Sequence, residues 1–371
     1  MNLTESVSGN RKMLKTKDVK VLISWYETAK RDLPWRKTGE AYSIWVSEIM
    51  LQQTRVEAVK SYYRAFMTKY PTVSKLAAAK EEDLNRIWEG LGYYSRVRNM
   101  HKAAKEVEES FGGRFPVSYD ALITLPGIGE YTAGAVASIA GGENVPAVDG
   151  NVLRVYARVN ALKENISDAK VRAGVRSALL QLMEKAKAAD DTFSPGAFNS
   201  AMMELGATVC LPNGAPKCEE CPFYSSCLAR KAGNPREYPV KAAKNKRRIE
   251  QRTIFILHSL EGIGLHKREN RGLLAGLYEF PSVPGHLSRK EAIETIKSYG
   301  YHPLTVKRIE DAVHIFSHVE WHMRGYFAKL DAITDPAKLD PENEIVFVTA
   351  SERKSAYALP SAFSAYKKYI L

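Results

Sequence analysis

The segment LPGIGEYTAGAVASIAGG, residues 125–142, decides the fold, because it joins a glycine turn directly to the start of a helix. Gly127 and Gly129 permit the tight backbone of such a turn, and the first N–H groups of the helix then point outward. With the partial positive charge of a helix N-terminus, these groups can bind one phosphate of a nucleic-acid backbone without reading its sequence. A plain structural turn has the same pattern, so the surrounding sequence has to separate the two interpretations.

The apolar pattern changes along the chain. It has a helical period in DVKVLISWYETAK, SIWVSEIMLQQ and GNVLRVYARVNAL, whereas RTIFILHSL and VEWHMRGYFAKL alternate or are rich in β-branched residues. Between those two strands, SRKEAIETIKSYG predicts a helix that ends at Gly300. We therefore expect a multi-domain protein with an all-α domain over residues 1–227, a basic linker over residues 228–251 and an α+β domain over residues 252–371.

The chain is strongly basic, with 54 Lys plus Arg against 42 Asp plus Glu and a formal net charge of +12. Residues 228–252 hold nine Lys or Arg and two acidic residues, so this stretch alone supplies +7. A solvated tether and a tether that lies along phosphate both fit this composition. A length of 371 residues, with 45% apolar residues and no long apolar run, excludes a disordered chain and a membrane-spanning one.

Two features indicate a reducing compartment. The first twenty residues lack the apolar stretch of a secretory signal. All four cysteines lie between residues 210 and 227, too clustered and too few for a disulfide-stapled secreted protein of this length. We expect a cytoplasmic monomer that does not associate with a membrane, and that is associated with the nucleoid if its source is bacterial.

The cysteines follow the pattern Cys210-x7-Cys218-x2-Cys221-x5-Cys227, which indicates a metal-binding loop. Zinc normally takes two short Cys pairs that come together, and here Cys218 and Cys221 form the one such pair. A compact loop of four thiolates suits a [4Fe-4S] cluster better, so the spacing favours this cluster over zinc.

Two carboxylates in the helical part are candidates for chemistry. Glu48 follows Ile44 and Trp45 on an apolar stripe, and no Lys or Arg stands three or four residues away from it. A desolvated, unpaired carboxyl group has a raised pKa and can act as a general acid, while the alternative is a Glu48 that faces water. Asp149 precedes a helix in VDGNV, where its ordinary role is an N-cap. An acid and a fixed carboxylate are also what cleavage of a glycosidic bond requires.

The combination of the turn LPGIG, the carboxylate in VDGNV and the four-cysteine loop resembles the helix-hairpin-helix DNA glycosylases that carry an iron–sulfur cluster. Within that superfamily, WVSEIMLQQTRV, GLGYYSRVRN, PAVDGNVLRV, FNSAMMELGA, GLLAGLYEFP and IFSHVEWHM are similar to the adenine DNA glycosylase (MutY) branch. The similarity runs from about Val19 to the C-terminal helix. It implies an all-α catalytic domain followed by an α+β Nudix-like domain. It also implies base excision repair by hydrolysis of the N-glycosidic bond of adenine mispaired with 8-oxoguanine or G in double-stranded DNA.

The resemblance assigns roles residue by residue. Glu48 matches the acid that protonates the adenine, and Asp149 matches the carboxylate that stabilises the oxocarbenium-like sugar. Tyr131 and Asn151 match positions that support these two groups. The residues that match positions wedged into the duplex or in contact with the oxidised guanine are Leu51, Gln53, Thr54, Leu91 and Tyr93. Trp35 and Arg36 match the adenine pocket, and Phe316, Ser317 and His318 match the loop that recognises 8-oxoguanine.

Position 131 separates this family from its relatives. Endonuclease III-like enzymes carry a lysine nucleophile just after the hairpin glycines, where this chain has Tyr131, so the resemblance implies a monofunctional enzyme that leaves an abasic site. The alternatives are a glycosylase or lyase of other specificity, and a non-catalytic iron–sulfur DNA-binding protein.

The sequence also departs from family patterns. Around GHLSRKEAIETIKSYG the REUxEE core that holds Mg²⁺ in Nudix hydrolases is absent, so nucleotide hydrolysis is not expected. The first cysteine gap is x7 where the family usually has x6, which calls for one bulged residue at Asn213-Gly214. Ser200 stands where relatives often carry a longer amide or carboxylate near the adenine, so base selectivity or rate is expected to differ.

Overall fold

The computed structural model describes residues 14–242, 246–331 and 345–370. Chain contacts divide them into two compact units. The first contains residues 14–78 and 99–242, and the second contains residues 79–98 together with the described residues from 246 onward. The domain boundaries expected from the sequence, after residues 227 and 251, stay a prediction. Among the described helices, none combines the length and the apolar character that a bilayer crossing needs.

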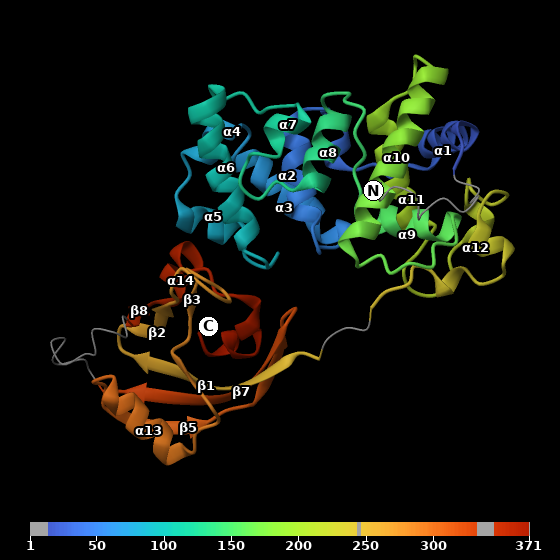
Figure 1. Ribbon diagram of the computed structural model, residues 1–371. Coiled ribbons are helices and arrows are strands. Elements are labelled where there is room, and N and C mark those ends of the chain that lie inside the picture. The colour runs from blue at the N-terminus through green and yellow to red at the C-terminus, as the bar shows by residue number, and fades with distance from the viewer. Residues whose placement is uncertain (1–13, 243–245, 332–344, 371) are drawn as a thin grey trace, which may run out of the picture. The chain divides into compact units, whose positions relative to one another are not determined.

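The first unit is helical, which confirms the expected all-α part (Figure 1). One helix, α6 (Ser95–Phe111), runs across the division between the units. The other elements are α1 (Thr16–Ala29), η1 (Pro34–Arg36), α2 (Ala41–Leu51), α3 (Val56–Lys69), α4 (Val73–Ala77), α7 (Tyr119–Leu122), α8 (Glu130–Ile139), α9 (Gly150–Val159), α10 (Ala169–Ala189), α11 (Pro195–Thr208), η2 (Cys218–Glu220), α12 (Leu228–Lys231) and η3 (Pro235–Glu237).

An apolar core joins α1, α9, α10 and α11. Three of these helices begin at a polar cap, namely Asp149 for α9, Asp168 for α10 and Ser194 for α11. Each cap side chain accepts a backbone N–H that the helix start would leave unpaired, so these residues fix where the helices begin. α9 and α11 approach closely at Gly206, where an added Cβ would lie 2.5 Å from the Cβ of Asn151.

Helix α2 is buried on all sides. Every residue from Tyr42 to Met50 is buried, and α3 and α8 pack against the helix (Figure 1). A helix that is apolar all round belongs in the interior of a domain. The carboxyl group that this helix carries, Glu48, is therefore largely buried.

The second unit contains a mixed sheet with strand order β3-β2-β1-β7-β5, and β4, β6 and β8 pair with β1, β7 and β2. β1 and β7 run parallel, and the other pairs are antiparallel. The elements are α5 (Glu81–Ile87), β1 (Arg248–Ser259), β2 (Gly262–Lys267), β3 (Tyr278–Glu279), β4 (Ser282–Pro284), α13 (Arg289–Ser298), β5 (Pro303–Arg308), β6 (Ala312–Ile315), β7 (Val319–Leu330), β8 (Ile345–Val348), α14 (Ala350–Ala356) and η5 (Ser361–Tyr369).

Both faces of this sheet are covered (Figure 1). Ile254 and Ile256 of β1 belong to a core shared with η5, whereas Phe255 and Leu257 belong to a second core shared with α13. A strand buried on both faces has a continuous apolar sequence, as in TIFIL. The unit confirms the expected α+β part that follows the helices.

Candidate active site

Glu48 lies inside the helical unit, with 7% of its surface exposed. The hydroxyl of Tyr131, from the first turn of α8, donates a hydrogen bond to Glu48 Oε2. Burial raises the pKa of Glu48 to about 7; the Tyr131 hydrogen bond and the charge of Arg36 lower it, and the charge of Asp149 raises it. Glu48 is therefore partly protonated at neutral pH, and the alternative of a water-facing Glu48 is wrong.

Asp149 is half-buried at the N-cap of α9. Its Oδ1 accepts the backbone N–H of Val152 at 2.7 Å, and its Oδ2 accepts the side-chain amide of Asn151 at 2.6 Å. Burial raises the pKa of Asp149 above its ordinary value, and these hydrogen bonds oppose that shift without cancelling it. They stabilise the carboxylate form and fix its orientation.

Asn151 is held in turn by a buried arginine. Arg154 Nη2 donates to Asn151 Oδ1 at 2.8 Å and to the carbonyl of Gly206 at 2.7 Å, and Arg154 Nε donates to the carbonyl of Cys210 at 2.8 Å. These contacts connect Asp149 through two side chains to α11 and to the first cysteine of the loop.

Glu48 and Asp149 line one open cleft of about 710 Å³. The size is within the range of about 300–1,000 Å³ for sites that take a small molecule or a base. Of the residues expected in the site, the structure brings nine together here: Trp35, Arg36, Glu48, Leu51, Gln53, Thr54, Tyr131, Asp149 and Asn151. Ser200 also lines the cleft. A group that can give a proton and a hydrogen-bonded carboxylate thus face the same space.

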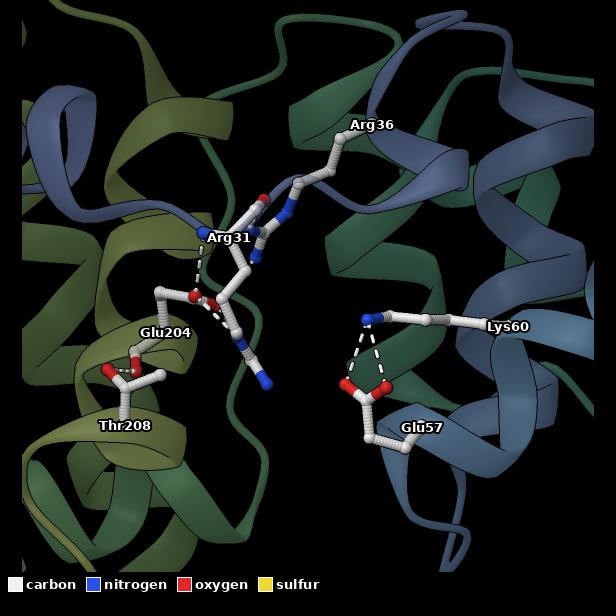
Figure 2. Close-up of polar contacts among 6 residues, drawn as sticks. All are labelled: Arg31, Arg36, Glu57, Lys60, Glu204 and Thr208. Atoms are coloured by element: carbon white, nitrogen blue, oxygen red, sulfur yellow. Dashed lines mark hydrogen bonds and ion pairs between the residues drawn. The ribbon is translucent and has the colours of Figure 1, made fainter.

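An ion-pair network that we did not expect from the sequence also lines this cleft (Figure 2). Glu204 of α11 is 1% exposed and binds Arg31 and Arg36, with the closest contacts at 2.7 Å to each. Burial alone would raise the pKa of Glu204, but the two arginines outweigh it and lower the pKa to about 2. Glu204 is therefore ionised wherever Glu48 titrates.

The glycine turn has the geometry that the sequence predicts. Gly127 has φ +77°, and a Cβ there would lie 2.6 Å from the Cβ of Asn99. Gly129 is the N-cap of α8, is exposed, and has no atom within 4 Å of an added Cβ. A phosphate could approach the helix start here, and phosphate binding by this turn stays a prediction.

The residues assigned to DNA contact differ in exposure. Gln53 is exposed and follows α2 with a left-handed φ of 57°, a backbone conformation that is uncommon outside glycine. Leu91 is 7% exposed, so most of its side chain is buried in this conformation. Its assignment to DNA contact stays a prediction.

The structure brings together Tyr93, which the resemblance assigns to the duplex or the oxidised guanine, and Ser317, which it assigns to the 8-oxoguanine loop. Tyr93 is 48% exposed and has a left-handed φ of 48°. Its hydroxyl lies 2.9 Å from Ser317 Oγ, and both residues belong to the second unit. Phe316 is half-buried, and Ser317 and His318 are exposed between β6 and β7.

The four cysteines line one pocket beside α9. Arg158 Nη1 donates to Cys210 Sγ at 3.3 Å, and Cys227 Sγ donates to the carbonyl of Arg158 at 3.4 Å. Burial raises the pKa of Cys221 to about 12. Gly214, inside the x7 gap, has φ +73°. Within the described parts of the chain, no three His, Cys, Asp or Glu side chains are grouped so as to hold a metal ion.

Comparisons with known proteins agree with this architecture. The family model of the HhH-GPD superfamily base excision DNA repair protein matches residues 46–179, and that of the NUDIX domain matches residues 253–369. The chain is 37% identical to the adenine DNA glycosylase of Homo sapiens, over 86% of this chain and 68% of the relative. It is 36% identical to that of Rattus norvegicus, over 84% and 70%. It is 32% identical to that of Buchnera aphidicola subsp. Schizaphis graminum (strain Sg), over 82% and 85%.

Proposed function

Because the chain belongs to the adenine DNA glycosylase (MutY) family, whose N-glycosylases act on DNA in base excision repair, we propose that it excises adenine mispaired with 8-oxoguanine or G. The observation that carries this proposal is the pairing of a partly protonated Glu48 with a hydrogen-bonded Asp149 in one cleft. Hydrolysis of an N-glycosidic bond needs both functions, since the leaving base takes a proton while the sugar becomes cationic.

In this mechanism Glu48 gives its proton to the adenine, and the bond between the base and C1′ breaks as the base leaves. Tyr131 holds the carboxyl group of Glu48 through its hydroxyl. Asp149, oriented by Val152 and Asn151, stabilises the positive charge on the sugar, and water then adds to C1′ and gives a proton back to the ionised Glu48. Tyr131 replaces the lysine nucleophile of the lyases, so the product is an abasic site.

The extrusion of a base from the duplex suggests roles for the other residues of the cleft. An adenine that leaves the duplex has to be taken up by the protein, and the gap in the stack has to be filled by side chains. Trp35 and Arg36 line the space for the base. Leu51, Gln53 and Thr54 lie at the same cleft and are proposed to contact the duplex, together with Leu91.

The NUDIX-like part is proposed to read the lesion rather than to hydrolyse nucleotides. The contact between Tyr93 and Ser317 supports this role, because it joins a residue assigned to the duplex or the oxidised guanine with one assigned to the loop that recognises 8-oxoguanine. Phe316 and His318 flank Ser317 and complete the proposed recognition loop.

The four-cysteine loop is proposed to hold a [4Fe-4S] cluster. The donor set consists of thiols that line a single pocket, and Arg158 supplies a positive charge beside Cys210, which suits an anionic thiolate group. When bound, the cluster would supply iron that displaces the thiol protons and cross-links the loop. The ligands would be Cys210, Cys218, Cys221 and Cys227.

We further propose that Gly127 and Gly129 contact a phosphate of the DNA. We also propose that the protein is a monomer and is cytoplasmic. The exposed helix start at Gly129 supports the first of these. The basic stretch over residues 228–252 would add affinity if it lies along the backbone.

The test is the release of free adenine from duplexes that carry A opposite 8-oxoguanine, A opposite G and A opposite T. We expect release from the first, weaker release from the second and none from the third. Glu48→Gln should release none while still binding the lesion duplex. Absence of release from all three duplexes, by protein with its full iron content, would overturn the proposal in favour of another lesion or of a non-catalytic DNA-binding role.

A further inference from the structure

Glu204 is a buried carboxylate that no step of the proposed mechanism uses. Arg31 binds it through Nε, Nη2 and its backbone N–H at 2.7, 2.8 and 3.1 Å. Arg36 Nη2 donates to Glu204 Oε2 at 2.7 Å. Among the described residues, the carboxylate is bound by these two arginines only, and Thr208 binds the main-chain carbonyl of Glu204 instead (Figure 2). The network therefore consists of one negative and two positive groups.

Arg36 connects this network to the proposed acid. Its guanidinium also donates to the carbonyl of Arg31 at 3.0 Å and lies over the ring of Tyr26 at 5.5 Å. The same guanidinium lines the cleft, and its positive charge acts on Glu48. Since a guanidinium has five N–H donors, Arg36 keeps donors free for a base after its two described hydrogen bonds.

We propose that Glu204 is a positioning residue of the glycosylase reaction: its carboxylate holds Arg36 at the cleft wall and balances the charge of that guanidinium, so that Glu48 keeps its proton. This inference rests on the proposed role of Glu48 as the acid. It assigns Glu204 no contact with the reacting atoms, because Glu204 acts through Arg36.

The charges that face Glu48 give the direction of the effect. Tyr131 comes from α8, Asp149 from the start of α9 and Arg36 from η1, and the negative Asp149 is the one of these that favours a protonated Glu48. Without the negative charge of Glu204 beside it, the positive charge of Arg36 would favour the ionised form of Glu48. Because the reaction needs the protonated form, the loss of Glu204 should move base release to lower pH.

The experiment is the single-turnover rate of adenine release from the A:8-oxoguanine duplex between pH 5 and 9, with the whole 371-residue chain. The wild-type rate should fall as pH rises, with a midpoint at about 7. In Glu204→Gln the midpoint should fall by about one pH unit, which lowers the rate at alkaline pH roughly tenfold relative to the low-pH plateau. In the double variant Glu204→Gln with Arg36→Gln, the midpoint should return to the wild-type value or above.

The matched control is Glu57→Gln. Glu57 is also a carboxylate near Arg31, but it is exposed and pairs with Lys60 at 2.8 Å (Figure 2). Its loss removes one negative charge from the same region without releasing Arg36. The midpoint of this variant should equal that of the wild type.

An unshifted midpoint in a folded Glu204→Gln overturns the inference and leaves the role of Glu48 intact. If the wild type shows no such midpoint, or if Glu48→Gln retains it, the role of Glu48 is overturned and the inference falls with it. If Glu204→Gln does not fold, Arg36→Gln tests the effect of the Arg36 charge on the protonation of Glu48 directly. Its midpoint should rise, because the charge that favours ionised Glu48 is gone, and a midpoint that stays in place overturns the inference.

Discussion

Gly206→Ala tests whether close packing of α11 against α9 positions Asp149. The added Cβ would lie 2.5 Å from the Cβ of Asn151, 3.0 Å from its Cα and 3.1 Å from its carbonyl carbon. Carbon atoms in contact prefer separations of about 3.5–4.0 Å, so the start of α9 has to move by about 1 Å. Such a shift moves Asn151 and, through the 2.6 Å hydrogen bond, the carboxylate of Asp149.

We expect Gly206→Ala to lower both the free energy of unfolding and the rate of adenine release, with the larger effect on the rate. Overpacking of this kind destabilises a fold by about 1–3 kcal/mol. A misplacement of about 1 Å at a reacting centre costs on the order of 10²-fold in rate. Adenine release by Gly206→Ala should therefore drop by about two orders of magnitude, while binding of the lesion duplex persists.

The assay combines single-turnover adenine release, duplex binding and thermal unfolding, with Gly174→Ala as the control. Gly174 lies in α10, and an added Cβ there has no neighbour within 4 Å. Gly174→Ala should keep the wild-type rate and gain up to about 1 kcal/mol of stability from helix propensity. Adenine release at the wild-type rate by a folded Gly206→Ala would refute the reasoning, because it would show that Asp149 does not depend on this packing.

The folded-state pKa of Glu204 lies at about 2, below its ordinary 4.5, so ionised Glu204 contributes about 3 kcal/mol above pH 4.5 and loses it as pH falls toward 2. Urea unfolding should accordingly show that Glu204→Gln is less stable than wild type at pH 7, with a difference that shrinks in acid. Cys221→Ser should lower the iron content of purified protein, as measured by iron analysis, and a full complement would contradict the proposed ligand set. Tyr93→Phe removes the hydroxyl that lies 2.9 Å from Ser317 Oγ, so the ratio of adenine release from A:8-oxoguanine and A:G duplexes should fall, and an unchanged ratio would remove Tyr93 from lesion recognition.

The sequence predicted the features that depend on local pattern. The helical period located α2 and α9, the glycines located the turn before α8, and Asp149 takes the N-cap position that VDGNV indicates. The class of both parts, all-α and then α+β, is confirmed for the same reason, since periods of 3.6 and 2 are local properties. Gln53 and Tyr93 have left-handed backbones, which are uncommon outside glycine and which the apolar pattern does not mark.

The apolar pattern also does not predict which segments that are distant in the sequence lie together in the fold. Residues 79–98 have an ordinary helical sequence, yet they belong to the same compact unit as the sheet. The contact between Tyr93 and Ser317 joins positions 224 residues apart. Periodicity describes one helix or strand at a time. It therefore predicts neither the grouping of residues 79–98 with the sheet nor the contact between Tyr93 and Ser317.

Glu48 and Glu204 have the same sequence pattern but different charge states, which the sequence alone does not predict. Both stand on largely apolar helices with no Lys or Arg three or four residues away, so the pattern that indicates a buried acid at Glu48 is also present at Glu204, where we did not expect a functional group. Both side chains are buried, at 7% and 1% exposed. Their pKa values shift in opposite directions: burial raises that of Glu48 to about 7 in spite of the Tyr131 hydrogen bond, whereas at Glu204 two guanidinium groups from a segment far away in the sequence outweigh burial. The helical pattern thus identifies a buried carboxylate, and the partners that the fold brings to it decide whether it can donate a proton or serves as a fixed negative charge.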